Sequence, residues 1–115
     1  MTTYEVNDIV LVRYPFTDLT TLKKRPAIIL SSKSYTNRFG DVVVMPLTSQ
    51  ADPDPVLALS EWRAAGLLKP TWAKPIIGTL STGLVQKHLG RLETADQACV
   101  RAALQILLDD LWRNP

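Results

Sequence analysis

Three apolar segments separated by turn-forming residues dominate the first half of the chain. They cover residues 8–14, 26–31 and 41–48, and Pro15 ends the first of them. Val, Ile and Leu fill these segments almost without alternation, which is typical of strands buried on both faces. We therefore expect a sheet whose two faces are both covered, by a helix, by closure into a barrel, or by a second copy of the chain.

Polar segments separate these strands, and weaker strand patterns follow them. Residues 16–24 and 33–40 are predicted to be loops, and residues 52–55, with two Asp-Pro pairs, a rigid turn. The weaker patterns predict short strands at 56–59 and 71–74 and a last strand at 84–92.

The C-terminal segment carries the pattern of a helix buried on one side. Thr94 and Gln97 fit a capping box, which predicts a helix over about residues 95–112. The apolar stripe of this helix comprises Val100, Ala103, Leu104, Leu107, Leu108 and Leu111. We expect the stripe to pack on the sheet; a partner-binding surface is the alternative. The order of elements predicts a mainly β fold with a C-terminal helix, built as a compact barrel or a strongly bent sheet.

Length and charge narrow the picture further. The chain has 115 residues, the size of one domain, which we assign to residues 1–115. The net charge is only +2, but the predicted helix contains Asp96, Asp109 and Asp110, so the positive excess lies before it. The run Lys23-Lys24-Arg25 suits an acidic or phosphate-bearing partner, although the charge evidence alone slightly favours a solvated loop.

Several classes of protein are disfavoured. No apolar run approaches the ~20 residues that span a bilayer, and the N-terminus lacks the features of a secretory signal, so we expect no membrane association and a cytoplasmic location. Cys99 is the only cysteine and His88 the only histidine, which excludes an intrachain disulfide and argues against a zinc site. Cys99 fits a core position, and His88 could be structural or catalytic. Asp52 and Asp54 are explained by the turn, so we expect neither a metal nor a cofactor.

Polar residues at the ends of two predicted strands are the strongest candidates for a site. Arg25 opens one strand directly before Pro26, and Thr48, Ser49 and Gln50 end the next. Strand ends held by a rigid sheet are common places for functional side chains. Spacing alone favours the simpler interpretation, an Arg that opens a strand and an ordinary Thr-Ser-Gln turn.

The same segments resemble a known family. They are Asp8-Ile9-Val10-Leu11-Val12, Tyr14-Pro15-Phe16-Thr17-Asp18, Lys24-Arg25-Pro26-Ala27-Ile28-Ile29-Leu30-Ser31, Val42-Val43-Val44-Met45-Pro46-Leu47-Thr48-Ser49-Gln50, Gly66-Leu67-Leu68-Lys69-Pro70 and Leu89-Gly90-Arg91-Leu92. In this order, followed by a helix, they resemble the MazF/PemK toxins of type II toxin–antitoxin systems over nearly the whole chain.

The resemblance implies an SH3-like small barrel with a terminal helix, forming a homodimer. It implies a metal-independent, sequence-specific endoribonuclease that cuts single-stranded mRNA. A cognate antitoxin would inhibit it with an acidic, disordered segment, and operator DNA would be contacted only through that antitoxin. Arg25 and Thr48 match the positions that the family uses for catalysis.

One segment departs from the family pattern. Some members carry an Arg and an Asp after the Lys-Pro motif, whereas this chain has Trp72-Ala73-Lys74-Pro75, in which Lys74 is the only cation. The departure leaves an alternative open: a non-catalytic barrel that binds a protein target, or that acts with its antitoxin as a DNA-bound co-repressor. Arg25 and Thr48 together favour the nuclease.

Cleavage of RNA needs no nucleophilic Ser or Cys and no metal, because RNA supplies its own nucleophile, the 2′-hydroxyl. A nuclease of this kind is therefore compatible with a chain that lacks the usual catalytic apparatus. Arg25 would stabilise charge on the phosphate, and Thr48 would hydrogen-bond a phosphate oxygen or orient the 2′-hydroxyl. Neither residue is suited to be the general base, which stays unassigned. Cations, polar groups and aromatic rings that would bind the RNA are Phe16, Lys23, Lys24, Ser49, Gln50, Trp72 and Lys74. Core packing is the alternative for the aromatic residues, more so for Trp72 than for Phe16.

Overall fold

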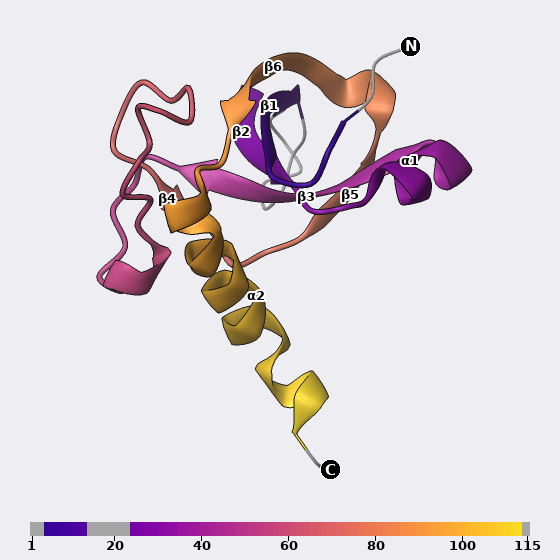
Figure 1. Ribbon diagram of the computed structural model, residues 1–115. Coiled ribbons are helices and arrows are strands. Elements are labelled where there is room, and N and C mark those ends of the chain that lie inside the picture. The colour runs from indigo at the N-terminus through magenta and orange to yellow at the C-terminus, as the bar shows by residue number, and fades with distance from the viewer. Residues whose placement is uncertain (1–3, 14–23, 114–115) are drawn as a thin grey trace.

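A strongly bent antiparallel sheet, with a long helix leaving one side of it, forms the fold in a computed structural model that describes residues 4–13 and 24–113 (Figure 1). The strands are β1 (Asp8–Arg13), β2 (Lys24–Ile29), β3 (Asp41–Thr48), β4 (Trp72–Ala73), β5 (Gly78–Ser81) and β6 (Val85–Arg91). The helices are α1 (Lys33–Phe39) and α2 (Gln97–Trp112), and three single 3₁₀ turns lie at Pro55–Leu57, Thr82–Leu84 and Thr94–Asp96.

The strand order is β4-β3-β2-β1-β6, with β5 also paired to β3. Strand β3 is long enough to serve two partners: its first half pairs with β5, and its last residues, Leu47 and Thr48, pair with β4. The three strands predicted from the apolar segments are confirmed, as is the last strand. The predicted mainly β fold with a C-terminal helix is therefore confirmed as well.

Two apolar clusters, one on each side of the sheet, explain why the strands are apolar without alternation. One contains Ile9, Ile28 and Met45 together with Val100 and Ala103 of α2. The other, on the opposite side of the same strands, comprises Tyr4, Val10, Val12, Ala27, Ile29, Val42, Val44 and Leu80. Both faces are thus covered within the chain, as a bent sheet allows, and a second copy is not required for that purpose.

Residues 33–39, predicted to be part of a loop, form the helix α1. Its N-terminus is capped by the Ser32 hydroxyl, which accepts a hydrogen bond from the Tyr35 amide at 3.1 Å. Its C-terminus is closed by Gly40, whose φ of 74° is left-handed and whose amide donates to the Thr36 carbonyl. The prediction was wrong because it treated Tyr35, Asn37 and Gly40 as turn residues, whereas Tyr35 and Asn37 lie within the helix and Gly40 caps it.

The predicted strand at 56–59 is also wrong. Pro55–Leu57 is a 3₁₀ turn, and only Ala58 forms a bridge, to Trp72. Leu57 and Leu59 are apolar because they are buried against α2, not because they pair in a sheet. The predicted strand at 71–74 shrinks to β4, and β5 was not predicted.

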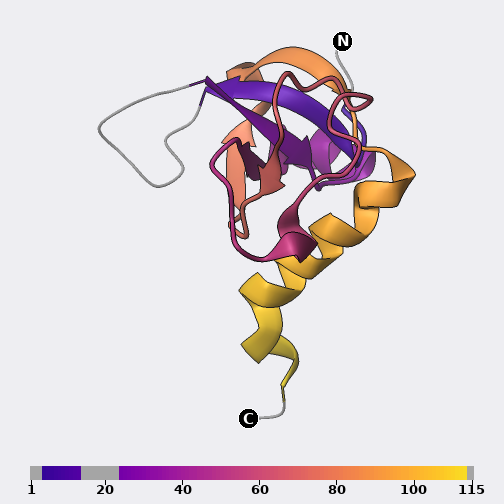
Figure 2. The same ribbon diagram turned by 90° about the vertical axis from the view of Figure 1, so that its left-hand side faces the viewer.

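The start of α2 differs from the predicted capping box. Thr94 begins a 3₁₀ turn, and the residue that precedes the α-helix is Asp96, whose side chain makes no capping bond to α2. The first half of α2 packs on the sheet through Cys99, Val100 and Ala103. The second half projects away from the sheet (Figure 2), and Leu111 at its end is 67% exposed. The stripe is therefore buried only in its first half. No helix in the described part of the chain is long and apolar enough to cross a membrane.

Candidate functional site

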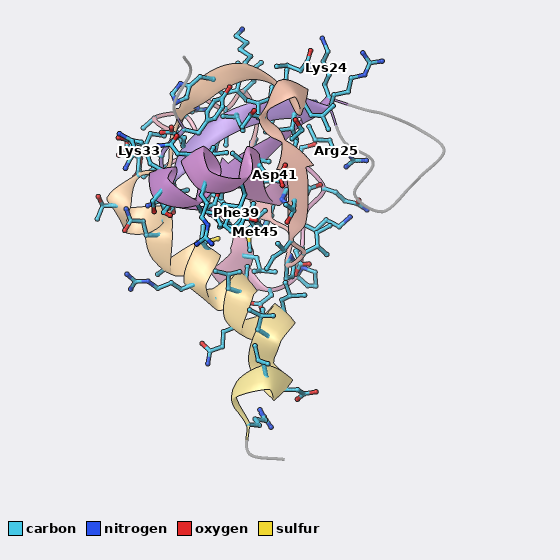
Figure 3. The ribbon with its side chains drawn as sticks, turned by 90° about the vertical axis from the view of Figure 1, so that its right-hand side faces the viewer. Lys24, Arg25, Lys33, Phe39, Asp41 and Met45 are labelled. Atoms are coloured by element: carbon cyan, nitrogen blue, oxygen red, sulfur yellow. The ribbon has the colours of Figure 1, made fainter. Side chains whose placement is uncertain are left out.

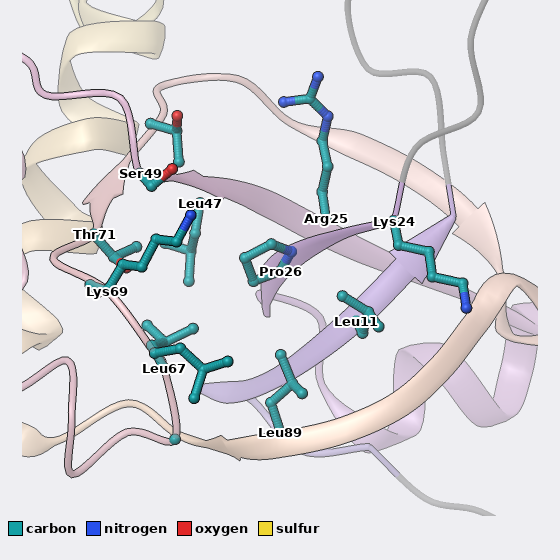
Figure 4. A pocket seen from close by; sticks show the side chains of 13 residues that line it. Leu11, Lys24, Arg25, Pro26, Leu47, Ser49, Leu67, Lys69, Thr71 and Leu89 are labelled. Carbon is teal, nitrogen blue, oxygen red and sulfur yellow. The ribbon is translucent and has the colours of Figure 1, made fainter.

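A pocket of about 530 Å³ lies where β2, β3 and the segment before β4 meet. Arg25 lines it from β2, Ser49 follows β3, and Lys69 comes from the segment before β4 (Figure 4). Apolar side chains complete the lining: Leu11, Pro26, Leu47, Leu67, Leu68 and Leu89. The pocket thus combines cations and hydroxyls with an apolar surface.

Arg25 and Thr48 are brought together by the pairing of β2 with β3. The antiparallel register aligns Ile28 with Met45 and Ala27 with Pro46. Arg25 and Thr48 each lie two residues beyond the last of these pairs, so they stand at the same end of the two strands. Both residues line the pocket. Sequence analysis placed each at a strand end, and the register explains why they share one site.

The polar atoms of this pair are available to a ligand. The Thr48 hydroxyl oxygen accepts a hydrogen bond from the Gln50 amide at 3.0 Å, which leaves its O–H free to donate. Within residues 4–13 and 24–113, no carboxylate lies within ion-pair distance of Arg25. Arg25, a partly buried residue without a counter-ion there, is suited to bind a phosphate through its guanidinium group.

The other predicted RNA-binding residues are distributed unevenly. Lys24 and Ser49 line the pocket. Gln50 and Lys74 line an adjacent depression, which Thr48 also lines, so the two hollows are contiguous at Thr48. Trp72 does not line the pocket; it pairs with Thr48 in the sheet and packs partly on the core. Phe16 and Lys23 lie outside the described residues.

Lys69 is a cation of the pocket that sequence analysis did not assign. Its signal was present in the Gly66–Pro70 segment, which the resemblance used only as a landmark. Leu67 and Leu89 were likewise not assigned. They come from segments far apart in the sequence, so only the folded chain shows that they line one pocket.

The remaining chemically active side chains lie elsewhere. His88 stands 3.5 Å from the Asp8 carboxylate, which Arg91 also contacts at 3.0 Å, so it lies beside the Asp8–Arg91 ion pair and does not line the pocket. Burial raises the pKa of the Cys99 thiol, which fits its core position. No group of three or more potential metal ligands occurs within residues 4–13 and 24–113. Figure 3 shows Lys24 and Arg25 on the side of the molecule opposite Lys33 of α1.

These features define a class: a small bent β-sheet with a C-terminal helix and a phosphate-suited, partly apolar pocket at the end of its central strands. Residues 5–108 match the family described as PemK-like, MazF-like toxin of type II toxin-antitoxin system. The chain belongs to this family.

Solved structures show the same fold at low sequence identity. MazF from Deinococcus radiodurans superposes with a TM-score of 0.76 at 21% identity, over 95% of this chain and 99% of that one. An endoribonuclease from Mycobacterial species, in complex with its cognate antitoxin, superposes with a TM-score of 0.69 at 20% identity, over 95% of this chain and 96% of that one. The Mycobacterium tuberculosis toxin MazF-mt6 superposes with a TM-score of 0.71 at 17% identity, over 89% of this chain and 96% of that one. No curated protein matches the chain.

Proposed function

We propose that this chain is a metal-independent endoribonuclease that cuts single-stranded RNA in the cytoplasm, with Arg25 and Thr48 as its catalytic pair. The observation that carries the proposal is that these two residues, at the ends of different strands, line one pocket. Similar solved structures that are described as endoribonucleases support the reaction class.

The reaction proceeds by transfer of a phosphodiester to the 2′-oxygen. The 2′-oxygen attacks phosphorus and loses its proton, the bond from phosphorus to the 5′-oxygen breaks, and the 5′-oxygen takes up a proton. The products are a 2′,3′-cyclic phosphate and a 5′-hydroxyl. Arg25 stabilises the negative charge that the two non-bridging oxygens gain in the transition state.

Thr48 contributes a hydrogen bond to the same phosphate. Its oxygen already accepts from the Gln50 amide, so the hydroxyl is oriented before RNA binds. A donor fixed in advance needs no reorganisation during the reaction. The described residues that line the pocket include neither a carboxylate nor a histidine, so the proton acceptor comes from outside this set.

The RNA occupies the pocket and the adjacent depression together. Lys24 and Lys69 neutralise backbone phosphates, and the apolar lining with Leu67 and Leu89 receives a base. Gln50 and Lys74 extend the contact along the strand. Charge neutralisation of this kind makes binding salt-dependent.

We also propose that an antitoxin inhibits the enzyme with an acidic segment. The cations that would hold RNA phosphates in the pocket, Lys24, Arg25 and Lys69, would equally hold carboxylates. The complexes of similar proteins with antitoxins support such a partner. The same basic pocket would then be used by the substrate and by its competitor.

The proposed oligomeric state is a homodimer. Ile106, Leu107 and Leu111 of α2 are 50%, 38% and 67% exposed, although all are large and apolar. Such residues at the projecting end of a helix are typical of a protein interface. Light scattering would give twice the chain mass.

Incubation of the purified protein with a long RNA in EDTA tests the function. We expect cleavage that leaves cyclic phosphate ends. Arg25→Ala should lose on the order of a hundredfold or more in rate, because a preorganised charge donor is removed. Lys33→Ala, on the opposite side of the molecule, is the matched control. Full cleavage by a folded Arg25→Ala protein would refute the assignment.

A further inference from the structure

A single helical turn, closed by caps at both ends, lies directly before Lys69 in the chain. The Ala65 amide donates to the Glu61 carbonyl, which closes the turn. At its C-terminal end the Leu67 amide donates to the Trp62 carbonyl and the Gly66 amide to the Arg63 carbonyl, with Gly66 at a φ of 94°. This pair of bonds around a left-handed glycine is a Schellman motif.

The N-terminal cap of this turn comes from a distant part of the chain, Asp96. One of its carboxylate oxygens accepts from both the Ser60 amide and the Ser60 hydroxyl, each at 2.8 Å. The other accepts from the Glu61 amide, also at 2.8 Å. Asp96 is 3% exposed and forms no ion pair within residues 4–13 and 24–113. These bonds explain why it does not cap its own helix.

Further contacts carry this constraint from the turn to the pocket. Gly66 packs directly on the backbone of Leu89 and Gly90 in β6. The Leu59 amide donates to the Thr71 carbonyl, which joins the two ends of the loop formed by residues 60–70. The Thr71 hydroxyl donates to the Lys69 carbonyl at 2.8 Å, so the backbone of Lys69 is fixed just beyond the turn.

We propose that Asp96 is a positioning residue for RNA binding: by capping the turn at Ser60 and Glu61, it holds Leu67 and Lys69 in the pocket. Arg25 and Thr48 come from β2 and β3, which Asp96 does not contact through hydrogen bonds. Asp96 therefore affects substrate affinity and not the chemical step. This inference rests on the proposed function.

The experiment compares Asp96→Asn with the control Asp110→Asn, an exposed carboxylate of the helix α2, which follows Asp96. The Asn amide would present a donor to one of the capping amides. We expect KM for RNA to rise about tenfold at unchanged kcat. If the role of Asp96 is purely structural, the substitution lowers the folded fraction instead, so that apparent kcat decreases and KM stays unchanged. The latter result would overturn the proposal.

A double-mutant cycle with Lys69→Ala sharpens the test. If Asp96 acts by placing Lys69, then Asp96→Asn adds little to the rise in KM already caused by Lys69→Ala. If the increases in KM caused by Asp96→Asn and by Lys69→Ala multiply in the double variant, the proposal is contradicted. If Asp96→Asn does not fold, Ser60→Ala removes one of the same bonds and should raise KM about twofold to threefold in the same coupled manner.

Amide hydrogen exchange makes the outcome independent of RNA cleavage. In Asp96→Asn, exchange at Ser60 and Glu61 should accelerate about tenfold or more, and exchange at Leu67 should accelerate with it while β1 stays protected. Acceleration confined to Ser60 and Glu61 would show that the cap is only local and would overturn the inference. A wild-type protein that cleaves no RNA would refute the proposed function, and this exchange result would still decide the role of Asp96.

Discussion

Gly66 and Gly90 pack backbone to backbone, and a Cβ on either would overlap a backbone carbonyl of the other segment. For Gly90 this carbonyl belongs to Ala65, and for Gly66 it belongs to Leu89. The contact joins the loop that carries Lys69 to β6. Both positions therefore require glycine for space, and Gly66 requires it also for its positive φ.

Gly90→Ala should lower the free energy of unfolding by about 2 kcal/mol or more, because rigid backbone must move to admit the methyl group. Urea denaturation would measure the loss. Gly83→Ala is the control, since its new Cβ would meet only the Ser81 hydroxyl at 3.7 Å and its φ is ordinary. Equal stability of the two variants would show that the close packing is not rigid.

Replacement of Thr48 should separate the role of its hydroxyl from that of its shape. Thr48→Val keeps the volume but loses the donor and the bond from Gln50, so we expect the cleavage rate to fall on the order of a hundredfold. Thr48→Ser keeps the hydroxyl and should retain most of the rate. Single-turnover cleavage measures both, and a fully active Thr48→Val protein would remove Thr48 from the catalytic pair.

Cys99 should react slowly with alkylating reagents in the native protein. Burial raises the pKa of its thiol, which donates to the Leu57 carbonyl at 3.1 Å, so less reactive thiolate is present. At pH 8, iodoacetamide should label the folded chain at least about tenfold more slowly than the chain in guanidinium. Mass spectrometry gives both rates; similar rates would mean that the first half of α2 opens readily.

The same raised pKa gives stability a defined dependence on alkaline pH. Because the folded thiol holds its proton above the ordinary value of 9.0, the unfolded chain ionises first as the pH rises past that value. The contribution of Cys99 to stability is therefore complete below pH 9.0 and decreases above it. A Cys99→Ala variant should lack this component of the pH profile.

Acid should weaken the attachment of α1 to the N-terminal turn. The hydrogen bond from Lys33 and the positive charge of Lys33 hold the pKa of Glu5 below 4.5. The Lys33 Nζ atom lies 2.8 Å from the Glu5 Oε1 atom. The contribution of Glu5 is thus present above pH 4.5 and is lost as the pH falls through its lowered pKa. Thermal melting between pH 6 and 3 should show a smaller acid-dependent loss in Lys33→Ala than in the wild type. An identical dependence in both would contradict this.

Charge at the projecting end of α2 should disrupt the proposed dimer. Leu111→Glu and Leu107→Glu would place a carboxylate in an apolar interface, so light scattering should show half the mass of the wild type. Gln105→Glu, an exposed position on the same helix, adds the same charge and should leave the mass unchanged. A dimer that survives both Leu111→Glu and Leu107→Glu would place the interface elsewhere.

The local sequence pattern was sufficient to predict those helices and strands that are specified by residues close together in the chain. The unbroken apolar runs predicted β1, β2 and β3 and the coverage of both sheet faces, and the apolar stripe predicted α2. It failed where one residue type serves two local structures. Residues 33–40 were assigned to a loop, but Gly40 caps the helix α1, and the apolar Leu57 and Leu59 were assigned to a strand but pack on α2.

The sequence by itself determined that Arg25 and Thr48 stand at strand ends, because strand boundaries follow from nearby Pro, Gly and polar residues. Only the tertiary structure decided that they share a pocket, because the register of β2 and β3 depends on pairs such as Ile28 and Met45 that are distant in the chain. The same holds for Lys69, which reaches the pocket just beyond a turn that the distant Asp96 caps. Such long-range contacts are set by the packing of the whole chain, and no local pattern encodes them.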